Sequence, residues 1–250
     1  MKTEHTFWLV ALLALALTPA AQAEEQVPLV EAHDMMEWER TAFVISEVLE
    51  YLPLGESRPV RYDLEGWVGG AYNRVWVKAE GEQATTDSGG TAELELLYGR
   101  LISPFWDLQL GLATDLQYGG QTNRRVAVGM GLQGLAPGWF ELEPTVFVSH
   151  RGDVSASLTA SYDLLLTQRL VAQPRLDTGV AVQEVPEFGV GAGWNDLGLA
   201  LRIRYEIWRE VAPYVGISWE RRFGGAARLA RAAGEPASEL SLVAGLRLWY

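Results

Sequence analysis

The sequence has no cysteine among its 250 residues, and it is poor in lysine and histidine. The lack of cysteine excludes disulfides, thiolate metal ligands and thiol nucleophiles. Lys2 and Lys78 are the only lysines, and 20 Lys and Arg stand against 32 Asp and Glu, for a net charge of -12. A nucleic-acid-binding protein needs a basic face for phosphates, so this charge argues against such a partner.

Beyond its N-terminal segment, the chain has no apolar run long enough to cross a membrane as a helix. Its apolar run, Phe7–Leu17, follows Lys2 and precedes the small-residue sequence Ala21-Gln22-Ala23. A positive start, a short apolar stretch and a small-residue cleavage site are typical of a secretory signal peptide. We therefore expect a signal peptide at 1–23 and a mature chain that begins at Glu24.

Strict alternation of polar and apolar residues is what the sequence does contain, from about residue 41 onward. It is clear in VSASLTAS (154–161) and LALRIRYEI (199–207). The polar positions hold Arg, Asp, Glu, Gln and Ser with almost no Lys, which suits a confined interior where charges pair. This pattern predicts an all-β fold, a transmembrane outer-membrane antiparallel β-barrel, with a water-soluble sandwich as the alternative.

The connections between alternating segments predict about twelve strands, with ten as the fallback. Five connections are tight and alternate with longer ones, so the tight turns and the C-terminus are expected on the periplasmic side. The barrel is then 41–250, preceded by a short periplasmic tail at 24–40. Its first strand, Thr41–Leu52, has a short helix as its alternative, and the longest loop, Arg222–Ser238, is a candidate to fold into the mouth. The tight turns are 69–73, 102–104, 135–138, 166–168 and 208–212, and the longer loops are 53–59, 82–90, 117–123, 150–152, 183–193 and 224–238.

Charged residues at inward positions of these strands form the largest group of candidate functional residues. One interpretation is an ion-pair network that fills the lumen, because unpaired charges in a narrow interior are costly. The other is a carboxylate-lined path for a cation. Arg204 and its inward neighbours Arg202 and Glu206 are expected to pair with Glu220 and Arg222, which project inward from the next strand across the turn 208–212. The residues with inward parity are Asp63, Glu65, Glu80, Glu93, Glu95, Asp107, Arg169, Arg175, Arg202, Arg204, Glu206, Glu220 and Arg247.

Several longer motifs resemble the copper resistance protein B family, outer-membrane proteins of bacterial copper-resistance operons. They include YDLEGWVGG (62–70), SPFWDLQ (103–109) and LLTQRL (165–170). The resemblance extends over about 61–250 and implies an outer-membrane barrel that takes part in copper tolerance. It leaves open whether the protein exports, admits or sequesters copper ions.

The resemblance directs attention to a possible copper-binding group in the tail. Many family members carry a long Met- and His-rich segment before the barrel, which is reduced here to EAHDMM (31–36). Thioether sulfur suits Cu(I) and imidazole suits Cu(II), so His33, Met35 and Met36 are the candidate metal ligands. The alternative is an ordinary tail in which these side chains pack or remain free. The expected partners are outer-membrane lipid, copper ions and a periplasmic copper-binding protein.

Two other functions remain in competition at this point, an outer-membrane lipid enzyme and a passive structural barrel. His150 is the only histidine of the predicted barrel, and Ser149 is its neighbour. Adjacent residues of a strand point to opposite faces, so these two cannot form a catalytic pair. We therefore expect no enzymatic activity.

Overall fold

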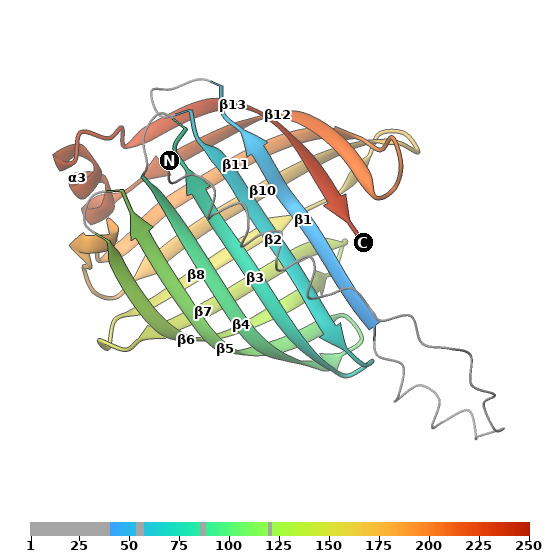
Figure 1. Cartoon of the computed structure of the whole chain (residues 1–250), viewed down its shortest axis with the longest axis horizontal. Coiled ribbons are helices and arrows are strands. Elements are labelled where there is room, and N and C mark those ends of the chain that lie inside the picture. Colours follow the sequence, from blue (N-terminus) through green and yellow to red (C-terminus); the bar gives the residue numbers. More distant parts are fainter. Residues whose placement is uncertain (1–40, 54–57, 86–88, 120–121) are drawn as a thin grey trace, which may run out of the picture.

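The computed structural model describes residues 41–53, 58–85, 89–119 and 122–250. The expected signal peptide (1–23) and tail (24–40), with His33, Met35 and Met36, lie outside the described residues. The described residues form one antiparallel sheet that closes into a barrel (Figure 1). The all-β prediction is therefore confirmed.

The described residues form thirteen strands, which occupy twelve positions around the barrel. Both β8 and the two-residue β9 pair with β10, so they are two pieces of one interrupted strand. The predicted number of twelve is thereby confirmed. The elements are β1 (Thr41–Tyr51), β2 (Val60–Gly69), β3 (Asn73–Gln83), β4 (Gly90–Ser103), β5 (Trp106–Tyr118), β6 (Asn123–Ala136), β7 (Phe140–Ser149), β8 (Val154–Ser161), β9 (Leu164–Leu165), β10 (Leu170–Ala181), η1 (Pro186–Phe188), β11 (Gly193–Tyr205), β12 (Val211–Arg222), α3 (Gly224–Ala232) and β13 (Ser238–Trp249).

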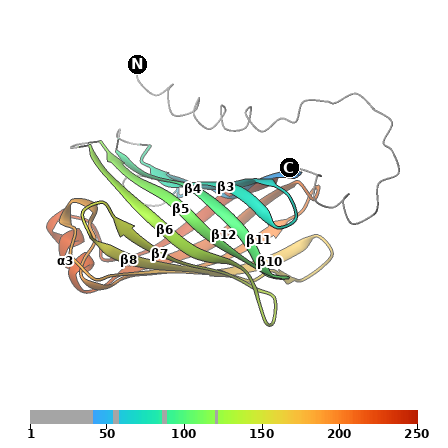
Figure 2. The same ribbon diagram turned by 90° about the horizontal axis from the view of Figure 1, so that it is seen from below.

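The barrel closes where the first strand pairs with the last. Ile45 lies opposite Trp249, and Val44 and Tyr250 exchange backbone hydrogen bonds of 2.9 and 2.8 Å. Closure leaves no open strand edge, which is what allows a sheet to sit in lipid. Figure 2 shows the strands running obliquely to the long axis, as closure of a sheet requires.

A bulge in β1 explains why its sequence was ambiguous between strand and helix. Ser46 pairs with Leu64 and Val48 with Asp63, so Glu47 is an extra residue in the ladder. A bulge shifts the inside–outside alternation by one residue. Glu47 and Glu50, which strict alternation would place on opposite faces, both reach the interior.

The outward face of the sheet is apolar and exposed. Leu96 and Leu112 lie opposite each other on β4 and β5, and each is 55% exposed. Tyr72, Trp139 and Trp208 stand exposed in three of the short turns. An apolar band with aromatic residues at its edge is the surface of a lipid-embedded barrel. No helix in the described part of the chain is long and apolar enough to span a membrane.

The β10–β11 connection and the β12–β13 connection, which contains α3, lie at the end of the barrel opposite the C-terminus (Figure 1). The loop predicted as the longest excursion contains α3, which buries Ala226, Ala227 and Ala230. The helix packs on β11 and β12. A Cβ atom on Gly191 would lie 2.3 Å from the backbone nitrogen of Ala226, so the β10–β11 loop and α3 are in close contact.

The closed sheet predicts resistance to denaturation by detergent. We expect the native protein to migrate differently on a gel before and after boiling, because unfolding requires the whole hydrogen-bonded ring to open. We also expect it to fractionate with the outer membrane. Recovery of the protein as a detergent-free monomer from the soluble periplasm would contradict the barrel.

Candidate functional site

A cavity of about 670 Å³ lies inside the barrel. Its lining includes Glu141 and Ser149 at the two ends of β7, and Asp153 and Ser161 beside the two ends of β8. The cavity therefore extends along this wall from the short-turn end to the long-loop end. We call it the acidic cavity, because most of the charged residues that line it are carboxylates.

Carboxylates greatly outnumber basic groups on the walls of the acidic cavity. Its lining contains twelve carboxylate residues and four basic ones. Such an excess favours the entry of cations, because the walls of a confined space focus the field of the charges they carry. The acidic residues are Glu47, Asp63, Glu65, Glu80, Glu93, Glu95, Asp115, Glu141, Glu143, Asp153, Asp177 and Asp196, and the basic ones are Lys78, Arg125, Arg175 and Arg247.

Four of these carboxylates form a row across adjacent strands. Asp63 on β2 lies opposite Glu80 on β3, which lies opposite Glu93 on β4, and Glu93 lies opposite Asp115 on β5. Like charges placed directly opposite each other destabilise a sheet. The arrangement is therefore costly for folding, and it calls for a functional explanation.

Arginine residues neutralise the two ends of this acidic row but leave its centre unpaired. The Arg175 guanidinium lies 2.9 Å from Asp63, and that of Arg125 lies 2.6 Å from Asp115. Within the residues that the structure describes, no basic side chain forms an ion pair with Glu80 or Glu93. The centre of the row thus presents to the cavity carboxyl groups without a basic partner among the described residues.

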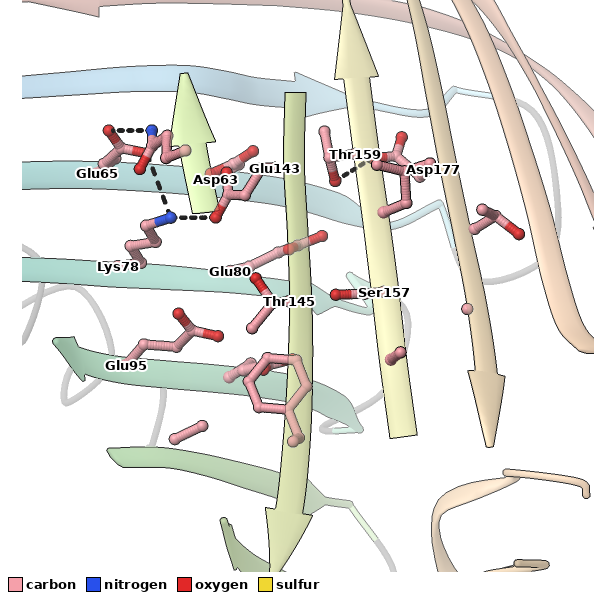
Figure 3. A pocket seen from close by; sticks show the side chains of 18 of the residues that line it. Asp63, Glu65, Lys78, Glu80, Glu95, Glu143, Thr145, Ser157, Thr159 and Asp177 are labelled. Carbon is pink, nitrogen blue, oxygen red and sulfur yellow. Dashed lines mark hydrogen bonds and ion pairs between the residues drawn. The ribbon is translucent and has the colours of Figure 1, made fainter. Parts of the chain in front are cut away.

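The facing wall supplies hydroxyl groups in addition to further carboxylates. Ser157 and Thr159 of β8, with Thr145 of β7, point into the cavity from the strands that cross in front of β2–β4 (Figure 3). Thr159 donates a hydrogen bond of 2.9 Å to Asp177. Both walls therefore present oxygen atoms as ligands for an ion, and oxygen is the ligand type that hydrated and hard cations accept.

Lys78 stands between the two walls. Its ammonium group forms an ion pair with Glu143 across the cavity and lies 3.9 Å from Glu65 on the neighbouring strand. Glu65 in turn accepts two hydrogen bonds of 3.0 Å from Gln133. These contacts, shown in Figure 3, connect β2 and β3 with β6 and β7.

The opposite side of the lumen is filled rather than hollow. Arg202 donates two hydrogen bonds of 3.1 Å to Glu50, and the hydroxyl of Tyr214 donates a third to the same carboxylate at 3.2 Å. The Glu50 side chain is 0% exposed and that of Arg202 is 7% exposed. A bidentate pair with an added donor satisfies a carboxylate that water cannot reach.

The expected pairing of Arg204 across its hairpin is wrong. We expected the inward charges of β11 to pair with Glu220 and Arg222 of β12, but Arg204 lies opposite Tyr214. Its guanidinium instead contacts Asp163, in the break between β8 and β9. The tilt of the strands brings side chains from more distant strands into contact, which pairing along one hairpin does not capture.

The remaining predicted lumen residues fall into several places. Asp107 is buried and pairs with Arg74 at 2.8 Å, Arg247 pairs with Glu47 at 3.0 Å, and Glu206 lies 3.7 Å from Arg204. Glu220 on β12 pairs with Arg61 on β2, with β13 and β1 between these two strands. Arg169 does not belong to a strand. It lies in the exposed turn that precedes β10, where the alternation of polar and apolar residues has ended. Those that line the acidic cavity are Asp63, Glu65, Glu80, Glu93, Glu95, Arg175 and Arg247.

Sequence reasoning missed Glu47, Glu50, Lys78 and Glu143. The two residues of β1 were hidden by the bulge. Lys78 had a visible signal, because it is the only lysine after residue 2. Its position opposite Glu65 and Glu95 follows from the β2–β3–β4 register.

No group of three His, Cys, Asp or Glu side chains converges as a metal site in the described part of the chain. The carboxylates of the acidic cavity are spread along its walls. Ser149 donates a hydrogen bond to Asp153 at 2.9 Å, whereas Nδ1 of His150 lies 3.0 Å from the carbonyl oxygen of Val126. These two residues therefore have separate partners, as expected for neighbours that point to opposite sides.

Comparison with solved structures supports the barrel class. The chain resembles the structure described as the NanC porin, with a TM-score of 0.51 and 12% sequence identity, over 83% of this chain and 99% of that one. The closed sheet, its apolar exterior and this likeness define an outer-membrane β-barrel protein.

Sequence comparison gives the family. Residues 40–250 match the family described as Copper resistance protein B precursor (CopB). The chain is 36% identical over 207 residues to Copper resistance protein B of Escherichia coli, which covers 83% of this chain and 69% of the relative. It is 35% identical over 209 residues to the homolog from Pseudomonas syringae pv. tomato, covering 84% and 70%. The protein belongs to the copper resistance protein B family, and its place is the outer membrane.

The buried pair on the filled side predicts a large effect of removing its cation. In Arg202→Met, Glu50 loses two of its three donors in a space without water, and we expect the free energy of unfolding to fall by about 3–5 kcal/mol. Arg204→Ala should act in the same direction, because its side chain is only 6% exposed. A lower temperature for the heat-induced gel shift measures both effects.

Arg222→Met provides the matched control, since its pair with Glu235 is 43% and 56% exposed. Its effect should stay within about 1 kcal/mol. If Arg202→Met and Arg222→Met shift the transition equally, the filled side of the lumen is hydrated and the assignment of a dry ion pair is wrong.

Proposed function

We propose that this protein contributes to copper resistance in the outer membrane by passing copper ions along its acidic cavity. The row of facing carboxylates carries this proposal. Negative charges opposite each other on neighbouring strands weaken a sheet, so their presence is best explained by a cation that moves between them. The names of the family and of the two curated relatives supply copper as the cation.

The dispersed arrangement of the carboxylates suits passage better than storage. A conducting path must attract an ion strongly enough for entry and hold it weakly enough for release. Glu80 and Glu93 contribute carboxyl oxygens without closing into a chelating group of three among the described residues. An ion that keeps part of its water shell would move past them and past the hydroxyls of β8.

The imidazole and thioether groups of the tail have a complementary role in this proposal. We propose that His33, Met35 and Met36 contact copper before or after its passage. Met36 precedes the first barrel residue, Thr41, by five positions, so an extended chain would reach about 17 Å from the start of β1. Thioether and imidazole groups at this end of the barrel would receive an ion from, or deliver it to, a periplasmic copper-binding protein.

The alternatives receive less support. A lipid enzyme requires a nucleophile and a base within hydrogen-bonding distance, but Ser149 bonds to Asp153 and His150 lies against the backbone of Val126. A passive barrel has no use for twelve carboxylates around one cavity. We therefore propose a role without catalysis.

Neutralising the centre of the acidic row should impair copper handling. In Glu80→Gln/Glu93→Gln, the cavity loses two acidic groups without a change in side-chain size, so the attraction for cations falls. We expect cellular copper content and copper tolerance of a deletion strain carrying this variant to resemble those of the strain without the gene. Copper content measured after exposure to copper gives the readout.

Glu184→Gln/Glu187→Gln makes the same charge change in the β10–β11 loop, where both side chains are paired at the surface. This control should behave as the natural protein does. Normal copper content and tolerance with the Glu80/Glu93 variant would contradict the proposed path through the acidic cavity.

Replacing His33, Met35 and Met36 by alanine should weaken copper binding while leaving the barrel folded. These residues precede β1, so the heat-induced gel shift should keep its temperature. Titration with copper under reducing and under oxidising conditions measures the affinity. Equal affinity of the variant and the natural protein would move the binding groups away from the tail.

A further inference from the structure

Lys78 differs from every other cation inside the barrel. The remaining basic residues that line the acidic cavity are arginines. Arg247 holds Glu47 by two hydrogen bonds of 3.1 and 3.0 Å in a planar, bidentate pair. Lysine instead offers a compact, strongly hydrated point charge on a flexible stem, and in this respect it resembles a mobile cation.

The surroundings of the Lys78 ammonium are those of a cation position. Glu143 from β7 forms an ion pair with it, Glu65 lies 3.9 Å away, and Glu95 faces it in register from β4. The lysine side chain is 11% exposed, so it occupies the space between the walls rather than the rim. Two carboxylates, from β2 and β7, therefore lie against one tethered positive charge, and a third faces it in register from β4.

A hydrogen-bonded chain holds this arrangement in place. Gln109, which is fully buried, donates to Gln133 at 2.6 Å, and Gln133 donates to both oxygens of Glu65. Glu65 is thus oriented independently of Lys78. Removal of the lysine would leave the carboxylate positioned toward the cavity.

We propose that Lys78 sets the cation selectivity of the barrel, because its ammonium group occupies a position that a passing cation would otherwise take. The inference rests on the proposed passage of cations through the acidic cavity. Next to Lys78, the centre of the acidic row at Glu80 and Glu93 stays free of ion pairs within the described residues. The tethered charge thereby limits how many mobile cations the cavity holds and how fast they pass.

Reconstitution into planar lipid bilayers under a KCl gradient tests this assignment. The reversal potential gives the permeability ratio of K⁺ to Cl⁻ for the natural protein, Lys78→Met, Lys78→Arg and Arg228→Met. For Lys78→Met we expect the ratio to rise about fivefold, the Boltzmann factor for two unit charges about 4 Å apart in water. Lys78→Arg keeps the charge and should remain close to the natural protein.

Arg228→Met is the matched control, because it removes one positive charge from the exposed face of α3, where Arg228 pairs with Glu184. It should leave the ratio unchanged. Lys78→Gln keeps an N–H donor for Glu143 and should show the same rise as Lys78→Met, which covers the case in which the methionine variant does not fold. The heat-induced gel shift verifies folding of each variant.

The outcomes separate this inference from the proposed function. A cation-selective natural protein together with an unchanged ratio in both neutral variants would overturn the role of Lys78 alone. A natural protein without cation selectivity would overturn the acidic path. In that case a gain of cation conductance in the neutral variants would still identify Lys78 as the blocking charge. If those variants gained no cation conductance, both the role of Lys78 and the acidic path would be rejected.

Discussion

Closure of the sheet between β1 and β13 is the constraint on which the rest of the molecule depends. Once the ring of hydrogen bonds is complete, every strand has one face toward lipid and one toward the interior, and the period of two assigns each residue to a side. Apolar residues such as Leu96 and Leu112 are then exposed to lipid. The charges on the other face have only one another, the water of the cavity and mobile ions as partners.

The interior meets this requirement in two different ways. On the side of β11, β12 and β1, the Glu50 carboxylate accepts hydrogen bonds from Arg202 and Tyr214, and its side chain is not exposed. On the side of the acidic cavity, carboxylates exceed basic groups and the row through Glu80 and Glu93 is unpaired at its centre within the described residues. Unpaired acidic groups are tolerated only where water or cations reach them. The surplus of carboxylates therefore lies on the side of the lumen that is hollow.

The alternation of the sequence was sufficient to predict the barrel, the twelve strand positions and the inward side of residues such as Asp63 and Glu65. Contacts across the lumen were beyond such reasoning, because they depend on the tilt of the strands and on irregularities of the ladder. Arg204 therefore found Asp163 rather than a residue of its hairpin, and the bulge at Glu47 concealed both acidic residues of β1. Arg169 shows the converse error, in which alternation was extended into a turn.

The proposed function assigns different ligand chemistry to different parts of the chain. Ligands that bind copper strongly, such as imidazole and thioether, would trap an ion in a narrow passage. The sequence places its only His and Met cluster before the barrel, at His33, Met35 and Met36, whereas the lining of the acidic cavity contains no His or Met among its described residues. Oxygen donors that are spread along a wall, without a chelating group among the described residues, hold a passing ion less tightly than such ligands do. The proposed function therefore separates binding from passage, with the barrel as the proposed route and the tail as the proposed point of capture.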